Sequence, residues 1–232
     1  MYPVDLMSSG IDGSAFRISN VDSEGRTVAL YTNIRLNRKP GIRGKNGMNI
    51  LFVDACVREH SRTRLLAEHV LARLDGTVTE VNPAAETNPI VSEQFIIRRN
   101  RATETGEFSD PVYTPARRFS EADVIVIAAP YWDLSFPAVL KAYFEQINVL
   151  GLTFEYTDDG FPRGLCRAKK LIYVTTAGGP IISDEYGYGY VKALAQNFYG
   201  IPDVCQVKAE MLDVISADVN EILNKALKEF VL

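Results

Sequence analysis

The chain has 232 residues, of which 47% are hydrophobic, so it is long and apolar enough for one α/β domain with a full core. Its net charge of −4 is uneven, because residues 1–47 carry 7 basic and 4 acidic residues and the rest of the chain carries 18 and 25. A body of negative sign is a poor general nucleic-acid binder, and we expect no nucleic-acid partner.

The cysteine pattern and the hydropathy exclude several further classes of protein. Cys56, Cys166 and Cys205 are widely spaced and form no CxxC pair, so we expect a reducing, cytoplasmic setting without a disulfide framework. No His, Cys and acidic residues have metal-ligand spacing, and no metal site is expected. No apolar run approaches the roughly 20 residues that cross a bilayer, and the first residues lack the core of a signal peptide, so we expect a soluble protein without a membrane partner.

Residues 1–47 differ from the rest of the chain. Glycines recur there among polar residues, and only the segment from Val28 to Leu36 has the composition of a strand. We interpret residues 1–47 as a poorly structured N-terminal extension. Its origin stays open between a native arm, an expression leader and sequence upstream of a start at Met48.

The folded domain is expected to comprise residues 48–232. The apolar run NILFVD at 49–54 predicts a first buried strand, and apolar spacing of three and four residues predicts a helix over 61–74. His69 falls on the apolar face of that helix and is expected to pack there. A second strand is predicted at 77–81.

The middle of the chain begins with its least periodic part. A helix is expected at 90–102, and a helical segment through Phe119 leads to a wholly apolar, β-branched run at 124–127. Such a run is typical of a central strand buried on both faces of a parallel sheet. Pro130 ends this strand because proline has no N–H to give to the ladder. From Ser135 the three- and four-residue spacing of apolar side chains predicts an amphipathic helix to Ile147.

The last third of the chain continues the alternation of strands and helices. Residues 151–165 are expected to form an excursion from the sheet, with a turn at Asp159–Gly160. The other expected elements are a strand at 170–176, a tyrosine- and glycine-rich loop at 186–190, a helix through Phe198, a strand at 203–211 and a helix at 217–230. We therefore predict a three-layer α/β fold with a five-stranded parallel sheet of order 2-1-3-4-5 and helices on both faces.

Three loops at strand carboxyl ends line one crevice in a sheet of this order. They are Ala55–Thr63, Pro130–Leu134 and Thr176–Pro180, which follow the first, third and fourth strands. In open α/β sheets, ligands bind at this switch point outside the carboxyl ends of the strands. The crevice is therefore the expected binding site.

The first loop is rich in arginine where a helix begins. Ser61 or Thr63 is suited to cap that helix, and capping alone is one interpretation of the pair. However, Arg58, Arg62 and Arg64 add positive charge to the positive end of the helix dipole, at a cost of roughly 0.3–1 kcal/mol each. A bound phosphate removes this conflict, since hydrogen bonds to a charged group contribute about 1.5–3 kcal/mol each. The loop is not a Walker A motif, which disfavours a triphosphate.

The second and third loops offer a flat apolar surface and close backbone approach. In the second loop, Pro130, Tyr131, Trp132, Asp133 and Leu134 leave the central strand as a mostly aromatic ledge, although a lone tryptophan also suits a core. The third loop continues from Thr176 through Ala177, Gly178 and Gly179, where the missing side chains let a ligand approach the backbone; a simple turn is the alternative. A planar ligand with one phosphate fits all three loops, and flavin mononucleotide (FMN) has this chemistry.

Residues 48–232 resemble the flavodoxin-like NAD(P)H-dependent oxidoreductases, the family of the FMN-dependent azoreductases and NAD(P)H:quinone reductases. The likeness rests on Ala129-Pro130-Tyr131-Trp132, on Pro137-Ala138 with Leu140-Lys141 and Phe144-Glu145, and on Gly151-Leu152-Thr153-Phe154-Glu155-Tyr156. Weaker matches follow at Thr175-Thr176-Ala177-Gly178-Gly179 and Phe198-Tyr199-Gly200.

The resemblance implies a homodimer with two FMN sites near the subunit interface. It assigns the flavin phosphate to Ser61–Thr63, the isoalloxazine to Tyr131–Leu134 and Thr176–Gly179, and the edge of the substrate space to Tyr156 and Phe198. Our hypothesis for the mechanism is that NADH or NADPH passes hydride to flavin N5, and that a quinone or azo compound then takes it up. No side chain is catalytic in this scheme, and the N–H groups of Gly178 and Gly179 stabilise charge near N1 and O2.

Two departures from the family pattern concern the flavin. Cys56 stands where a serine is common in the phosphate loop, and Asp133 replaces the asparagine usual in azoreductases. The first removes a strong donor. The second places a carboxylate in the flavin loop, and we expect Asp133 either to point away from the flavin or to shift its potential. In addition, Tyr186, Tyr188 and Tyr190 are expected either to form a lid over the substrate or to be an exposed turn.

Two other functions remain open from the sequence. A flavodoxin-type electron carrier would bind FMN without nicotinamide turnover, and a regulatory module of the same fold would bind no flavin. A serine hydrolase is excluded, since the chain has no GxSxG motif.

Overall fold

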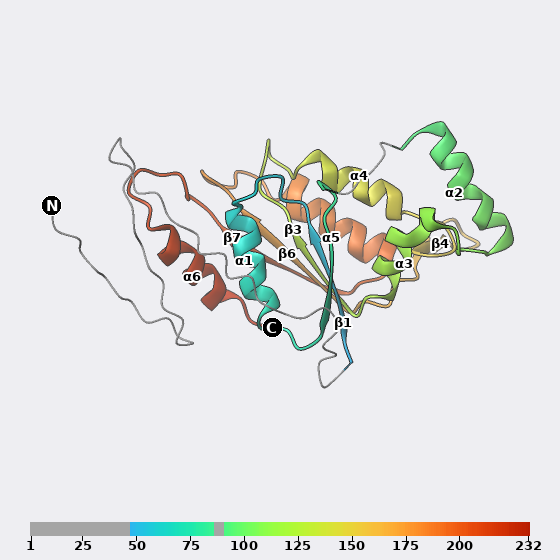
Figure 1. Ribbon diagram of the computed structural model, residues 1–232, viewed down its shortest axis with the longest axis horizontal. Helices are drawn as coiled ribbons and strands as arrows, with labels where there is room; N and C mark the ends of the chain where they lie inside the picture. Colours follow the sequence, from blue (N-terminus) through green and yellow to red (C-terminus); the bar gives the residue numbers. More distant parts are fainter. Residues whose placement is uncertain (1–46, 86–90) are drawn as a thin grey trace. The chain divides into compact units, whose positions relative to one another are not determined.

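The computed structural model describes residues 47–85 and 91–232, without the side chains of 102–104 (Figure 1). The predicted extension lies outside the described residues, except for Gly47. The strands are β1 (Asn49–Asp54), β2 (Thr77–Val81), β3 (Val124–Ala128), β4 (Phe154–Tyr156), β5 (Pro162–Gly164), β6 (Lys170–Thr176) and β7 (Asp203–Ala209). The α-helices are α1 (Arg62–Leu71), α2 (Glu93–Thr105), α3 (Thr114–Glu121), α4 (Ala138–Ile147), α5 (Tyr190–Leu194) and α6 (Val219–Glu229).

Five strands form one parallel sheet in the order β2-β1-β3-β6-β7, which confirms the predicted fold and its strand order. The central strand β3 is buried along its whole length, as its β-branched sequence predicts. β4 and β5 pair antiparallel in a separate hairpin, so the predicted excursion from the sheet is also confirmed.

Two cores lie on the two faces of this sheet. On one face, Ile50 and Phe52 pack with apolar residues of α1 and α6. On the other face, Leu51 and Val53 pack with α3, α4 and the helical segment that contains α5. Figure 1 shows α1 beside α6, separate from α3, α4 and α5. The alternation of side chains along β1 thus divides the helices between the two layers.

Several element ends differ from the sequence prediction. α4 begins at Ala138 rather than Ser135, because Pro137 takes the cap position with a ψ of 142° and Ser135 is still bonded to Trp132 in the preceding turn. β7 ends at Ala209 rather than Met211, where the backbone turns into the left-handed region with a φ of 65°. α2 begins three residues later than predicted and α1 ends three residues earlier.

The prediction of a loop at 186–190 is wrong. Residues Glu185–Gly189 form a π-helical turn that continues into α5 and a second π-helical turn, Ala195–Tyr199. Its tyrosines hold it in place: the Tyr188 hydroxyl donates to the Val204 carbonyl at 2.9 Å, and the Tyr190 ring packs on Phe136. Tertiary packing therefore overrides the tendency of the glycines to interrupt a helix.

Candidate functional site

The tips of β1, β3 and β6 are neighbours at one edge of the sheet. The parallel register pairs Asp54 with Ala128 and Ala128 with Val174. Beyond the strands, the Tyr131 N–H donates to the Thr176 carbonyl at 3.0 Å. The expected convergence of three loops at the switch point is therefore confirmed.

Two hydroxyls of the first loop are engaged by the protein itself. Ser61 caps α1, since its Oγ accepts from the Arg64 N–H at 3.3 Å. Thr63 is 1% exposed, and its Oγ1 lies 2.7 Å from Thr176 Oγ1. Capping thus accounts for Ser61, whereas Thr63 ties the first loop to the third.

Arg64 does not belong to an anion site. Its guanidinium forms ion pairs with the buried carboxylate of Asp54, with Glu80 at 2.7 Å and with Glu68 at 3.0 Å. The hydrogen bond to Glu80 raises the pKa of Arg64, and the charge of Asp54 adds to this, against the lowering by partial burial. The conflict that we inferred between Arg64 and the helix dipole is therefore resolved within the chain.

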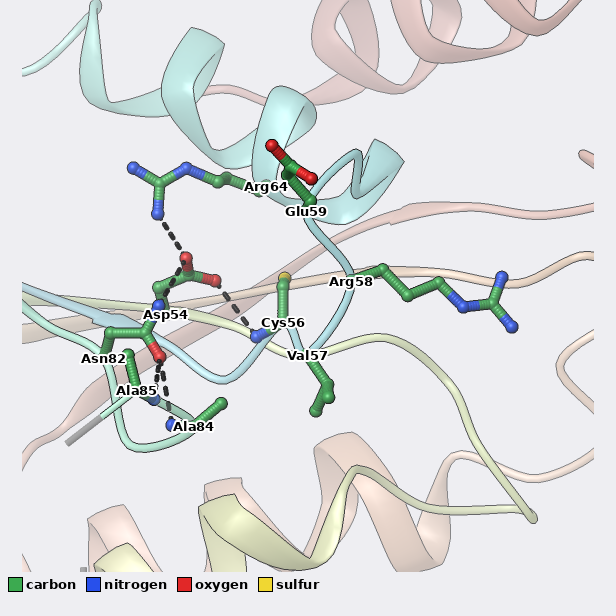
Figure 2. Close-up of a pocket in the computed structure, with 9 residues that line it drawn as sticks. All are labelled: Asp54, Cys56, Val57, Arg58, Glu59, Arg64, Asn82, Ala84 and Ala85. Atoms are coloured by element: carbon green, nitrogen blue, oxygen red, sulfur yellow. Dashed lines mark hydrogen bonds and ion pairs between the residues drawn. The ribbon is translucent and has the colours of Figure 1, made fainter. Parts of the chain in front are cut away.

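Arg62 and Arg58 leave the first loop in other directions. Arg62 Nη1 donates to the Leu212 carbonyl at 2.8 Å, and its Nη2 lies 2.5 Å from Asp213 Oδ1. Arg58 is exposed, and its Cζ lies 5.9 Å from the ring centroid of Trp132, within the range of a cation–π contact. Figure 2 shows Arg58 and Arg64 extending apart from the loop that carries Asp54 and Cys56.

The second loop is a tight turn with unusual backbone angles. Trp132 and Ser135 exchange backbone hydrogen bonds of 3.1 and 2.8 Å, and the residues between them, Asp133 and Leu134, have φ values of 50° and 68°. Two left-handed residues in a row are typical of a type I′ turn, in which a residue such as leucine is strained. Trp132 is 37% exposed and Leu134 43%, so the core interpretation of the tryptophan is wrong. The turn leaves both side chains exposed beyond the carboxyl end of β3.

The third loop uses its carbonyl groups to bind the segment after β7. The carbonyls of Ala177, Gly178 and Gly179 accept from backbone N–H groups of residues 211–213 at 2.9–3.2 Å. Within the described residues, the N–H groups of Gly178 and Gly179 have no protein acceptor. A Cβ added at Gly179 would meet no atom within 4 Å, so there is open space beside this backbone. The third loop is therefore an open cradle with two free donors, rather than only a turn.

The predicted substrate residues separate into two places. Tyr186 is 57% exposed and belongs to the crevice, since its carbonyl accepts from Ser135 Oγ at 2.6 Å. Tyr156 and Phe198 both pack on Phe154. The ring centroid of Phe154 lies 5.5 Å from that of Tyr156 and 5.2 Å from that of Phe198. Figure 1 shows β4 beyond the carboxyl end of α4, whereas the second loop precedes its amino end. At 1.5 Å per residue α4 is about 15 Å long, so these two aromatic residues lie away from the crevice of their own chain.

A cavity of about 320 Å³ opens on the β2 side of the first loop, and not between β1 and β3. Its lining residues are Asp54, Cys56, Val57, Arg58, Glu59, Arg64, Asn82, Ala84 and Ala85 (Figure 2). The buried Asp54 carboxylate accepts from the Cys56 N–H at 3.0 Å and from Arg64 and Asn82. Burial raises the pKa of the Cys56 thiol, and the Asp54 charge raises it further, so this thiol is neutral. The Asp54 carboxylate is thus satisfied by Cys56, Arg64 and Asn82, three other residues of the cavity lining.

Leu212 and Asp213 fix Arg62 and the third loop, and neither residue was predicted from the sequence. The available signal was their position directly after a strand of the same sheet, at the same carboxyl edge. In the part of the chain that the structure describes, no group of three His, Cys, Asp or Glu side chains has a metal-site geometry. None of the described helices has both the length and the apolar character needed to cross a bilayer.

The comparisons with known proteins agree with this fold. Residues 48–231 match the protein family described as flavodoxin-like fold. An FMN-dependent NADH:quinone oxidoreductase of Coprothermobacter proteolyticus is 33% identical over 192 residues, which cover 78% of this chain and 94% of that protein. A second one, from Clostridium acetobutylicum, is 44% identical over 119 residues, which cover 49% of this chain and 58% of that protein. Among solved structures, an azoreductase from Bacillus anthracis has a TM-score of 0.66 at 28% identity, covering 78% of this chain and 96% of that one.

Proposed function

This chain belongs to the flavodoxin-like fold family, and on that premise we propose that it is an FMN-dependent NAD(P)H oxidoreductase that reduces quinones, azo compounds or similar electron-poor acceptors. One observation carries the proposal: three strand tips gather a cationic loop, an aromatic turn and two free N–H donors in one crevice. Residues 48–232 would form the FMN-binding domain, with residues 1–47 as an extension.

The crevice fits each part of FMN. Arg58 is free of acidic partners among the described residues, and the first turn of α1 leaves the N–H groups of Arg62 and Thr63 without intrahelical acceptors. A phosphate would be held by Arg58, by these N–H groups and by the Ser61 hydroxyl, whose oxygen caps α1 as an acceptor while its O–H can still donate. Arg62 and Thr63 would thus contribute backbone rather than side-chain donors.

The ring system would lie between the second and third loops. Trp132 and Leu134 offer exposed apolar surface, with Pro130, Tyr131 and Asp133 beside them in the same turn. Thr176 and Ala177 are buried and support Gly178 and Gly179, whose N–H groups would stabilise negative charge on a planar ligand. When bound, FMN would supply hydride acceptance and hydride donation at N5.

We further propose a cytoplasmic homodimer. Tyr156 and Phe198 lie about one helix length from the crevice of their own chain, so they would border a substrate only if a partner subunit brought its own pair to that crevice. The three free cysteines are consistent with a reducing compartment. A sedimentation-velocity measurement tests the dimer, and a monomer at micromolar concentration would contradict it.

An absorption spectrum of the purified protein and an anaerobic titration test the function. With added FMN, we expect the absorption bands of protein-bound flavin at nearly full occupancy of the site. These bands should bleach when NADH or NADPH is added and return when a quinone is added. Flavin bands without bleaching would assign the chain to electron carriers. A colourless protein that gains no thermal stability from FMN would assign it to flavin-free modules.

A further inference from the structure

The segment after β7 runs along the third loop and binds its backbone. The N–H of Met211 donates to the Gly179 carbonyl at 3.1 Å, that of Leu212 to Ala177 at 3.2 Å, and that of Asp213 to Gly178 at 2.9 Å. We call residues Met211–Asp213 the brace. Three hydrogen bonds over three residues fix the peptide planes of the third loop.

The brace determines where the N–H groups of Gly178 and Gly179 point. In a planar trans peptide, the carbonyl of one residue and the N–H of the next point in opposite directions. The carbonyls of Ala177 and Gly178 both point to the brace, so the N–H groups of Gly178 and Gly179 both point away from it. Two successive N–H groups that share one direction form a concave site for negative charge.

Asp213 and Arg62 hold the brace in place. The Arg62 guanidinium binds two points of the brace at once, the Leu212 carbonyl at 2.8 Å and the Asp213 carboxylate at 2.5 Å. A Cβ on Gly178 would overlap Asp213 Oδ2, so glycine lets the carboxylate approach the third loop. Met211 begins the brace in the left-handed region, which a residue with a side chain adopts only when its surroundings enforce it.

We propose that Asp213 and Arg62 are positioning residues that, through the brace, aim the N–H groups of Gly178 and Gly179 at the electron-rich edge of the planar ligand. The inference rests on the proposed function. It also changes the role of Arg62: its side chain serves the third loop, and Arg58 is the side chain left for the phosphate.

Riboflavin has the same ring system as FMN but no phosphate. It therefore distinguishes a role of Arg62 in binding the phosphate from a role in holding the brace. We expect Arg62→Met and Asp213→Asn each to weaken binding of both FMN and riboflavin about tenfold, the worth of one charge-assisted hydrogen bond. The double variant is expected to bind no more weakly than either single variant, because both changes release the same brace. Fluorescence-quenching titrations give the dissociation constants.

Lys225→Met with Glu229→Gln is a matched control. It removes an ion pair whose side chains are 75% and 68% exposed on α6, and we expect unchanged affinity for both ligands. A loss confined to FMN in Arg62→Met would overturn the proposal in favour of a phosphate ligand. Tighter FMN binding by Asp213→Asn would also overturn the proposal, because it would mean that Asp213 competes with the phosphate for Arg62.

Amide hydrogen exchange of the ligand-free protein tests the brace apart from the function. We expect the amides of Leu212 and Asp213 to exchange about tenfold faster in Arg62→Met and in Asp213→Asn, with the rest of β7 unchanged. Asp213 is 66% exposed at its side chain, so its replacement leaves the core intact. Equal exchange in all variants would overturn the brace. Failure of the wild type to bind either flavin would overturn the proposed function alone.

Discussion

The two sides of the first loop satisfy their charges in different ways. On the β2 side, Arg64 is surrounded by the carboxylates of Asp54, Glu68 and Glu80, so its positive charge is fully compensated within the protein. Arg58 lines the same cavity but extends away from this cluster and lies over the face of Trp132 (Figure 2). Among the described residues Arg58 has no acidic partner, and the N–H groups of Gly178 and Gly179 have no protein acceptor. Two arginines six residues apart thus have different roles. A cationic loop therefore indicates a ligand site only where the fold leaves its charges without acidic partners.

Removing Arg64 is expected to have the largest effect on stability. Arg64→Met would leave the Asp54 carboxylate, 2% exposed, without its guanidinium, and we expect the free energy of unfolding to fall by about 3 kcal/mol. Urea unfolding monitored by circular dichroism measures this loss. The double variant Arg64→Met with Asp54→Asn should recover part of it, and a full loss in the double variant would show that the buried charge is not the cause.

Removing Arg58 is expected to affect binding rather than folding. Arg58→Met should weaken FMN binding by about 1.5–3 kcal/mol, because one charge-assisted bond to the phosphate is lost. Stability should change by less than about 0.5 kcal/mol, as for other exposed residues. Riboflavin affinity is expected to stay unchanged, in contrast to Arg62→Met. Equal losses for both flavins would contradict an assignment of Arg58 to the phosphate.

The left-handed turn gives a third, smaller contrast. At most positions a protein with glycine is less stable than the same protein with alanine. At position 134, where φ is 68°, we expect the opposite order. We expect Leu134→Gly to be about 1 kcal/mol more stable than Leu134→Ala, since only the glycine relieves the strain. Thermal unfolding of the two variants measures the difference, and the ordinary order would exclude strain in this turn.

An ion pair at the opposite edge of the sheet provides the smallest effect. Partial burial raises the pKa of Asp123, but hydrogen bonds from the Asn49 N–H, at 2.8 Å, and from Arg167 lower it more, so the net shift is downward. The resulting stability is therefore present above the unfolded-state pKa of about 3.9 and is lost as the pH falls through the lower, folded-state pKa. We expect Asp123→Asn to reduce the free energy of unfolding by less than about 1 kcal/mol at pH 7. Below the folded-state pKa of Asp123 we expect no reduction, because the carboxyl group is then protonated in the folded and the unfolded protein. An effect of equal size at both pH values would contradict the linkage.

Much of the fold follows from local patterns along the chain. The β-branched run at 124–127 and the apolar runs at 49–54 and 170–176 specify buried strands whatever surrounds them, because such segments bury well only inside a sheet. The aromatic ledge after Pro130 follows in the same way, since proline ends the strand and the next side chains must leave the sheet. Chain order and the right-handed crossover rule then leave few strand orders to choose from.

Local patterns along the chain therefore predict the sheet, the positions of the three loops and the kind of ligand that they suit. The partners of each arginine depend instead on tertiary contacts, because Arg62 binds Asp213 across 151 residues and Arg64 binds Glu80 across 16. Such pairs depend on strand register and on the rotation of α1, which no local spacing encodes. The same holds for residues 185–199, where packing on Tyr173, Phe136 and Phe144 makes a helix of a glycine-rich sequence.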